Sequence, residues 1–284
     1  MSTWKDNTTL AVLNPTDIKT SVLSIDSKFR DVAQSTSSSD FLIRLPRTYK
    51  NVITMRLSSI ELPNTWYTYE KAHGDTGFLL NGVYGSIPSG NYDPNALAVV
   101  VQDAFNAVGT RTYTVAFNSI TGLITINSND SAPFTMQFSG VNSFVPYDSG
   151  LGYSMGFTQA SYVGRARYTG EYVVDTLSDN YVLMQLPDVE SAVDSFTYGS
   201  SSIEAFAKII VTVPKYGLVY DDGSNLITKQ IQFAQPTNIS FFRVRLVDAY
   251  GNVLVLHADF SFTLEFQEVV NSKTYSAYRT NLLS

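Results

Sequence analysis

Apolar and polar residues alternate in short runs over most of this 284-residue chain. Gly, Pro, Asn, Asp and Ser interrupt the runs at short intervals, a pattern typical of an all-β sandwich or barrel. The pattern predicts strands over residues 21–27, 41–45, 52–62, 78–80, 113–117, 123–126, 134–138, 172–175, 181–186, 203–213, 229–233, 240–248, 253–256 and 259–268.

Two pairs of these strands are separated by turns of hairpin length. The first turn contains Thr121 and Gly122, and the second spans residues 248–252. Gly251, in the second turn, can adopt the positive φ that such turns often require. Both segments are therefore predicted to be antiparallel hairpins.

One helix is predicted among the strands. Asp93 is suited to cap its first turn, Pro94 is favoured at the first helical position, and Gly109 ends it. The apolar residues at helical spacing are Leu97, Val100, Val101, Ala104, Phe105 and Val108. Together with the strands that follow, the helix predicts a small inserted α+β subdomain over about residues 87–160, between two β-rich flanks.

Charged residues are scarce and aromatic residues are abundant. Charged residues make up 15% of the chain, where an average globular protein has about 25%. Aromatic residues reach 13%, with 18 Tyr and 17 Phe. Depletion of charge with enrichment in aromatic side chains is typical of the buried part of permanent protein interfaces. The composition favours an interaction protein; the alternative is a monomer whose large β core uses the aromatic residues.

The absence of Cys and the acidic balance exclude several classes of function. The chain has no Cys, a net charge of -6 and a pI near 4.9. Without Cys there is no disulfide, no thiolate metal site and no cysteine nucleophile. The acidic balance argues against direct nucleic-acid binding, which needs a basic patch. We find no signal peptide and no membrane-spanning run, and we expect a protein that is not secreted.

The chain is also poor in residues that carry catalysis. His73 and His257 have no partner at the spacing of a metal site or a catalytic triad. The glycine-rich run at 150–157 has neither the following helix of a dinucleotide site nor the Gly-Lys-Ser/Thr of a phosphate loop, so a tightly packed turn is preferred. We expect no enzyme activity, no metal and no cofactor.

The two ends of the chain differ from its middle. Residues 1–20 and 269–284 contain isolated apolar residues without a clear period. They are either frayed ends or arms that become ordered on a neighbouring molecule. In the second case the expected interface anchors are Trp4, Tyr275, Tyr278 and Arg279.

A surface-binding module is the alternative function. In a fibre head or a carbohydrate-binding sandwich, Trp66, Tyr67 and Tyr69 would be exposed and would stack on sugar rings. Trp66 follows a long predicted strand and could equally close the core at its end.

Several segments follow one another in the order seen in a known family. They are residues 24–31 (SIDSKFRD), 39–46 (SDFLIRLP), 50–64 (KNVITMRLSSIELPN), 87–92 (IPSGNY), the predicted helix, 120–126 (ITGLITI) and 151–157 (LGYSMGF). Over about residues 21–160 the chain resembles the minor capsid proteins, or penton proteins, of nucleocytoplasmic large DNA viruses.

The resemblance implies an all-β fold: a jelly-roll antiparallel β-sandwich over residues 21–268, with the inserted subdomain and two terminal arms. It implies a structural role in an icosahedral virus shell and no enzyme activity. The implied partners are the major capsid protein, other minor capsid proteins and further copies of the chain. Either a cement between capsomers or a penton at the vertices fits, as does either face of the shell, including the one near an inner viral membrane. The expected location is the virion, after assembly in the host cytoplasm.

Overall fold

The fold is seen in a computed structural model that describes residues 17–35, 37–138, 150–177, 179–190, 196–198, 203–222 and 231–270. It is mostly antiparallel β-structure, as the alternating pattern predicts. The strands are β1 (Ile18–Asp26), β2 (Asp40–Pro63), β3 (Gly77–Leu80), β4 (Val83–Ser86), β5 (Tyr113–Asn118), β6 (Leu123–Ser128), β7 (Phe134–Gln137), β8 (Ser161–Arg165), β9 (Arg167–Thr169), β10 (Tyr181–Gln185), β11 (Phe196–Tyr198), β12 (Ile203–Ala205), β13 (Ala207–Ile210), β14 (Leu218–Asp221), β15 (Ile231–Val247) and β16 (Ser261–Val269). The helices are α1 (Pro94–Val108), α2 (Leu151–Ser154) and α3 (Pro187–Glu190), with short 3-10 turns η2 (Ser27–Phe29) and η3 (Lys71–His73).

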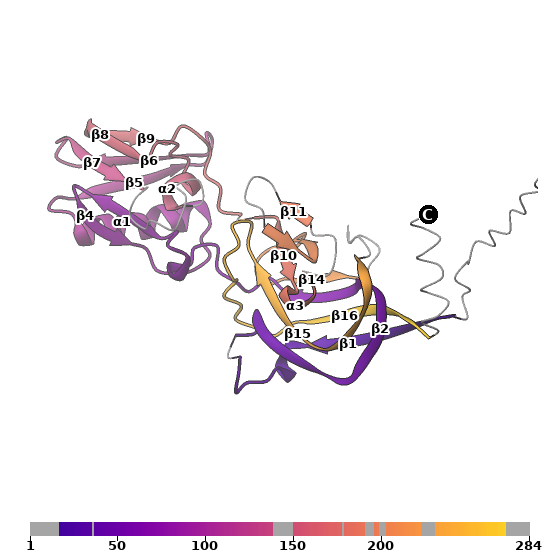
Figure 1. Ribbon diagram of the computed structural model, residues 1–284. Coiled ribbons are helices and arrows are strands. Elements are labelled where there is room, and N and C mark those ends of the chain that lie inside the picture. The colour runs from indigo at the N-terminus through magenta and orange to yellow at the C-terminus, as the bar shows by residue number, and fades with distance from the viewer. Residues whose placement is uncertain are drawn as a thin grey trace, which may run out of the picture. The chain divides into compact units, whose positions relative to one another are not determined.

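The chain divides into two compact units. Unit 1 combines residues 1–65 with 181–284, and unit 2 is the continuous segment 66–180. Unit 2 therefore starts before residue 87 and ends after residue 160, the approximate limits that the pattern indicates for the insertion. Each unit is described by itself (Figure 1).

Unit 1 is built on one curled sheet in which β2 and β15 are long enough to take part in both halves (Figure 1). In the first half, β1 pairs with β16, β16 pairs with the C-terminal part of β2, and that part of β2 pairs with β14 and the start of β15. In the second half, the N-terminal part of β2 pairs with the C-terminal part of β15, followed by β10 and β13.

This order is that of a jelly roll. The first strand, β1, lies beside the last, β16, and β2 and β15 each contribute one strand to either half. The chain thus crosses repeatedly between two facing halves, as in the double Greek key of jelly rolls. Unit 2 occupies the connection between β2 and β10. The expected fold class, a jelly-roll β-sandwich, is confirmed.

β2 and β15 bend together at two asparagines. Asn51 adopts φ 52°, in the left-handed region that Asn tolerates better than most residues. Its backbone N–H donates to Oδ1 of Asn238 on β15 at 3.0 Å, and the register of the pair shifts on both sides of Thr237. The chain therefore changes from one half of the sheet to the other without leaving the strand. For this reason the separate strands expected at 41–45 and 52–62 are one strand, and likewise those expected at 229–233 and 240–248.

Aromatic and aliphatic side chains fill the space between the two halves. Along β16, Phe262, Leu264 and Phe266 alternate with polar residues and are buried. The ring of Phe266 lies 4.8 Å from that of Tyr49 on β2. Many of the chain's aromatic residues are thus used in this core.

Unit 2 has its own hydrophobic core, formed by α1 and two small sheets. Their strand orders are β4-β3-β7-β8 and β5-β6-β9. Asp93 caps α1 by accepting hydrogen bonds from the N–H groups of Asn95 and Ala96. The helix and the β5–β6 hairpin are confirmed as predicted.

Two predicted strands are wrong. Residues 253–256 form only an isolated bridge between Val253 and Val247, and residues 172–175 form no strand. Both segments are rich in apolar and β-branched residues, but no neighbouring backbone runs beside them for long enough to build a ladder.

Candidate interaction surfaces

The turn after β1 is fastened to the segment just before β16 through the buried Ser27. The Ser27 hydroxyl donates to Oδ1 of Asp259 at 2.7 Å and accepts from the Phe260 N–H at 3.0 Å. The Ser27 N–H in turn donates to the Phe260 carbonyl at 2.9 Å. Every polar group of Ser27 is therefore used, which is what a fully buried hydroxyl requires.

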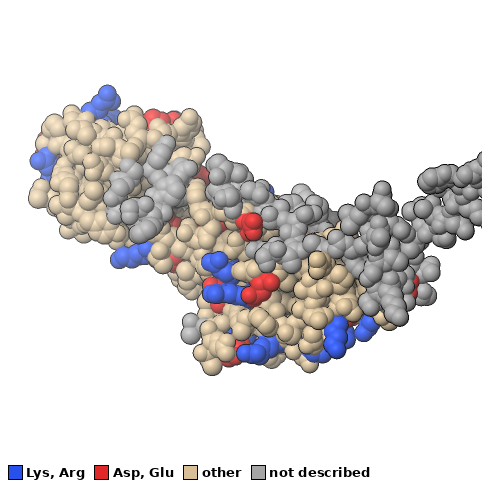
Figure 2. Space-filling view, in the orientation of Figure 1, with Lys and Arg blue, Asp and Glu red and all other residues tan. Residues whose placement is uncertain are grey.

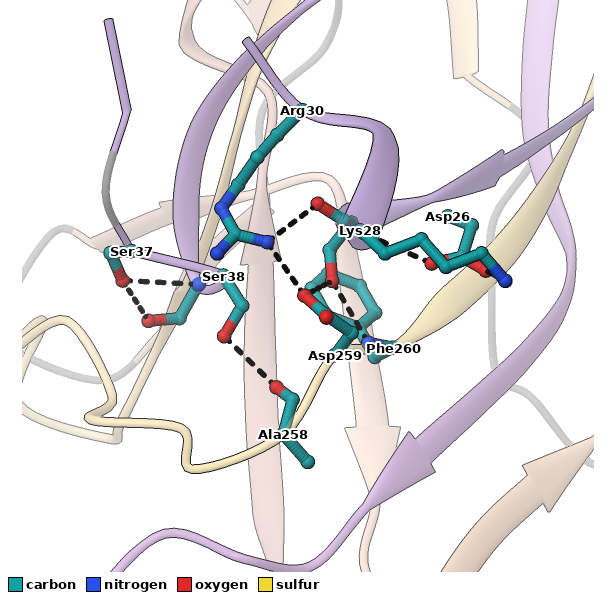
Figure 3. Close-up of polar contacts among 10 residues, drawn as sticks. Asp26, Lys28, Arg30, Ser37, Ser38, Ala258, Asp259 and Phe260 are labelled. Carbon is teal, nitrogen blue, oxygen red and sulfur yellow. Dashed lines mark hydrogen bonds and ion pairs between the residues drawn. The ribbon is translucent and has the colours of Figure 1, made fainter. Parts of the chain in front are cut away.

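Arg30 adds a charged tie to the same point. Its Nη1 donates to Oδ1 of Asp259 at 2.6 Å and to the carbonyl of Ser27 at 2.8 Å (Figure 3). Only 17% of the Arg30 side chain is exposed, so this ion pair is less screened by solvent than a surface pair. A charge-assisted bond to both sides of the turn holds its backbone in one conformation.

Asp26 and Lys28 complete the turn. The Asp26 carboxylate caps η2 by accepting from the Lys28 N–H at 3.0 Å, and it pairs with Lys28 Nζ at 2.6 Å. Burial pushes the pKa of Asp26 upward, but the hydrogen bonds and the charge of Lys28 outweigh it, so this pKa lies below its usual value.

A run of serines fastens the other end of the loop. Ser38 and Ser39 are buried. The Ser38 hydroxyl donates to the Ala258 carbonyl at 2.9 Å, and the Ser39 hydroxyl donates to the carbonyl of Leu254. The Ser37 and Ser39 hydroxyls lie 2.8 Å apart (Figure 3). Both ends of the loop between β1 and β2 are thus tied to residues 254–260.

The braced loop presents two apolar side chains to solvent. Phe29 is 74% exposed and Val32 is also exposed. Lys28 Nζ lies 5.0 Å from the centre of the Phe29 ring. Aromatic side chains held on a rigid frame are typical anchors of protein interfaces, because little conformational freedom is lost when they bind. The turn residues Asp, Ser, Lys and Arg around Phe29 are the sequence signal for this loop.

The two ends of the described chain begin side by side. Ile18 pairs with Val269, and the Val270 N–H donates to the Asp17 carbonyl at 2.9 Å. A buried carboxylate lies next to this pair: Glu268 accepts from the Ser21 hydroxyl at 2.6 Å. The segments before residue 17 and after residue 270 therefore start from one corner of unit 1.

Glu268 is held from the β2 side as well. Its carboxylate pairs with Arg47 Nη2 at 3.4 Å and accepts from the Lys50 N–H at 3.2 Å. The Arg47 guanidinium lies 4.4 Å from the centre of the Tyr49 ring. The corner is thus braced by one carboxylate that joins β1, β2 and β16.

β14 and the turn before it carry a row of exposed apolar side chains. Tyr216, Leu218 and Tyr220 are exposed, while Val219 between them is buried. Within the described chain, β14 pairs only with β2. The sequence analysis did not predict this row. The sequence signal for it is a short segment, not predicted as a strand, that has apolar residues at successive positions and therefore on both faces.

The outer face of the sheet between β1 and β14 is closed by its own polar pairs. Across β2 and β16 these pairs are Thr54–Gln267 at 3.0 Å, Arg56–Glu265 at 2.7 Å, Ser59–Thr263 at 3.0 Å and Glu61–Ser261 at 2.7 Å. Polar cross-strand pairs stabilise a solvent-facing sheet. The large exposed apolar side chains of this part of the sheet therefore lie on its outer strands, β1 and β14.

The residues expected to stack on sugars do not form an exposed aromatic row. Trp66 is 5% exposed and Tyr69 is 1% exposed, and Tyr67 is half-buried. The Tyr69 ring lies 5.7 Å from that of Tyr92, and burial raises the pKa of Tyr69 well above its usual value. These rings are apolar enough for a core and lie where unit 2 begins. The arm anchors Trp4, Tyr275, Tyr278 and Arg279 lie outside the described residues.

Among the described residues, no group of three or more His, Cys, Asp or Glu side chains could hold a metal ion. The glycine-rich run forms the short helix α2 and a tightly packed turn after it: a Cβ on Gly152 would lie 2.2 Å from the Phe138 ring, and Gly156 adopts φ 84°. In the part of the chain that the structure describes, no helix is long and apolar enough to cross a membrane.

Comparisons with known proteins find solved structures that resemble this chain. No family model matches the chain, and no curated protein matches its sequence. Among solved structures, the mavirus penton protein is similar over 88% of this chain and 98% of its own, with 10% sequence identity and a TM-score of 0.46. The assignment to the jelly-roll class rests on the strand order of unit 1 itself.

Proposed function

We infer that this chain is a structural component of an icosahedral virus shell: a minor capsid protein that links major capsid capsomers through permanent interfaces. Jelly rolls serve as capsid and lectin domains and as metal-holding enzymes. The role of a capsid domain agrees best with a jelly roll that exposes several large apolar side chains and whose described residues contain no group of metal-ligating side chains.

The observation that carries the inference is the braced loop. Ser27, Arg30 and Asp259 fix a turn whose outer side chains, Phe29 and Val32, are apolar and exposed. Exposed apolar groups on a rigid support reduce the entropy lost on binding, which favours stable association. The role requires no catalysis, and we infer that the protein is not an enzyme and needs no cofactor.

In this proposal the sandwich runs from Ile18 to Val269, because Ile18–Thr20 of β1 pair with Gln267–Val269 of β16. The arms expected at 1–20 and 269–284 are therefore shortened to 1–16 and 271–284, and these shorter arms reach neighbouring molecules. The arm anchors would be Trp4, Tyr275, Tyr278 and Arg279. The partners would be the major capsid protein, other minor capsid proteins and further copies of the chain, in a virion assembled in the host cytoplasm. A penton at the vertices would have the same structural role, but the number of copies of the chain per particle would differ.

The test is quantitative mass spectrometry of purified, protease-treated particles. We expect protected copies at a fixed ratio to the most abundant shell protein. Five copies per vertex would identify a penton, and a larger fixed multiple would identify a cement between capsomers. Absence from the particles, or complete removal by protease, would reject the shell role. Truncations that remove 1–16 or 271–284 should fold and fail to be incorporated, and normal incorporation of both would reject the role of the arms.

A further inference from the structure

The negative charge of the chain is concentrated in unit 2. Residues 66–180 contain four Lys or Arg and nine Asp or Glu, whereas the remainder of the chain contains 15 and 16. Unit 2 thus carries -5 of the total charge of -6. A surface on this unit will attract basic partners and repel acidic ones.

Unit 2 also exposes a group of large apolar side chains. They are Ile120, Tyr153, Tyr172, Val173 and Leu177, and together they are called the 120–177 patch here. Ile120, at the tip of the β5–β6 hairpin, is 93% exposed. A single exposed apolar residue needs no explanation, but a group of them on neighbouring segments is typical of an interaction site.

Backbone hydrogen bonds bring the three segments of the patch together. Residues 172–175 lie between the hairpin tip and the turn after α2. On one side the Val174 N–H donates to the Gly122 carbonyl at 2.8 Å, and on the other the Asp175 N–H donates to the Ser154 carbonyl at 2.8 Å. The Val173 side chain covers Gly122, where a Cβ would lie only 3.0 Å from Val173 Cγ1. The three segments that carry the patch are therefore adjacent.

The charged residues of the patch are acidic. Asp175 lies in its central segment and Glu171 and Asp179 flank that segment in the sequence, and neither 112–164 nor 168–180 contains a Lys or Arg. Glu171 accepts from the Tyr162 hydroxyl at 2.6 Å, and the Asp175 carboxylate accepts from the Leu177 N–H at 2.9 Å. Burial and the bond to Glu171 raise the pKa of Tyr162 to about 12, which keeps the phenol a donor. A complementary partner is both apolar and basic.

The C-terminal segment of the chain has this chemistry. Residues 271–284 contain Lys273 and Arg279 but no Asp or Glu. Their large apolar residues are Tyr275, Tyr278, Leu282 and Leu283. The segment thus combines the two properties that the 120–177 patch requires of its occupant.

We propose that residues 271–284 of one copy bind to the 120–177 patch of a second copy. The aromatic and leucine side chains cover the apolar residues of the patch, and Lys273 and Arg279 face its carboxylates. Because the donor segment and the receiving surface differ, each molecule can give one contact and accept another, which builds rings or chains. The proposal deepens the assembly role inferred above, since it gives the C-terminal arm its receiving surface.

The probe is a synthetic peptide of residues 271–284 with a fluorophore at its N-terminus. It is titrated with the chain truncated after Val270, and the anisotropy of the fluorophore reports binding. The truncation removes none of the described residues, so the pairing of β16 with β1 and β2 is kept. We expect saturable binding that weakens as salt rises. The Ile120→Ser/Leu177→Ser variant should weaken binding at least about tenfold. Val163→Ser, exposed on β8 outside the patch, is the matched control and should change it by less than about twofold.

Each other outcome rejects a defined part of the proposal. No binding, or equal binding to the Ile120→Ser/Leu177→Ser variant, overturns it. If the truncated chain still self-associates in sedimentation and the patch variant does not, the patch binds a second patch and the proposal is wrong. If the peptide fails to bind but the protein is incorporated into particles, only the receiving surface is rejected. If the peptide binds but the protein is absent from particles, the shell role fails and the contact between copies stands.

Discussion

The guanidinium of Arg30 donates a 2.6 Å hydrogen bond to the carboxylate of Asp259, 229 residues later in the chain. The same carboxylate oxygen accepts a hydrogen bond from the Ser27 hydroxyl. The Asp259 carboxylate therefore holds the turn that follows β1. The turn directly follows β1, the first strand of the jelly roll, and Asp259 directly precedes β16, the last strand. The exposed Phe29 is therefore supported by the closure of the whole sandwich rather than by its local sequence.

Removal of this carboxylate should destabilise unit 1. Asp259→Ala deprives Ser27 and Arg30 of a shared acceptor, and we expect a loss of about 1–2 kcal/mol, since the carboxylate itself is 44% exposed. Urea denaturation measures the loss. Lys28→Ala, which removes the more exposed pair with Asp26 and the contact of Nζ with the exposed Phe29 ring, should cost less than about 0.5 kcal/mol. Equal losses in the two variants would show that the tie to Asp259 has no special weight.

Phe29 should matter for assembly and not for folding. Because its ring is exposed, Phe29→Ser should change the free energy of unfolding by less than about 0.5 kcal/mol. Incorporation into particles, measured by mass spectrometry, should fall. Val83→Ser, at an exposed site in unit 2, is the comparison and should be incorporated normally. Normal incorporation of Phe29→Ser would remove the loop from the interface.

Gly156 should tolerate a side chain less well than Gly164. Both have a positive φ, 84° and 81°, so Ala is strained at either position. At Gly164 nothing lies within 4 Å of the added Cβ, and the cost should be about 1 kcal/mol. At Gly156 the Tyr172 carbonyl oxygen would lie 2.0 Å away, and because backbone must move we expect at least about 2 kcal/mol more. Thermal unfolding of the two variants gives the order, and a smaller loss for Gly156→Ala would contradict it.

Lys215 should make stability rise with pH in the alkaline range. Burial lowers its pKa from 10.5 to about 8. Between these values the unfolded chain holds a proton that the folded chain has released, so the free energy of unfolding increases with pH. Relative to Lys215→Met, the natural protein should thus gain stability from about pH 8 to about pH 10. Urea denaturation gives the free energy of unfolding of both proteins at each pH. The difference between the two values removes the contribution of the tyrosines, which titrate in both proteins. Parallel curves would show that the Lys215 pKa does not change on folding.

Local chemistry was enough to predict the elements that depend on near neighbours. Asp93 and Pro94 start the helix, and the turn around Gly122 closes a hairpin, because capping and turn geometry involve residues a few positions apart. The alternation along β16 likewise indicated which of its side chains face the core.

The placement of these elements depends on contacts between residues far apart in the chain. The polar bend at Asn51 reads as a break between strands, and only its bond to Asn238 makes β2 continuous. Ser38 and Ser39 read as a loop, but distant carbonyls make them buried supports. The sequence left open whether Trp66 binds sugars or closes the core, and the packing of unit 2 buries both Trp66 and Tyr69. The alternation of apolar and polar residues shows which side chains prefer to be buried. Which residues bury them depends on how distant strands pack together in the whole sandwich, and no local sequence pattern contains this information.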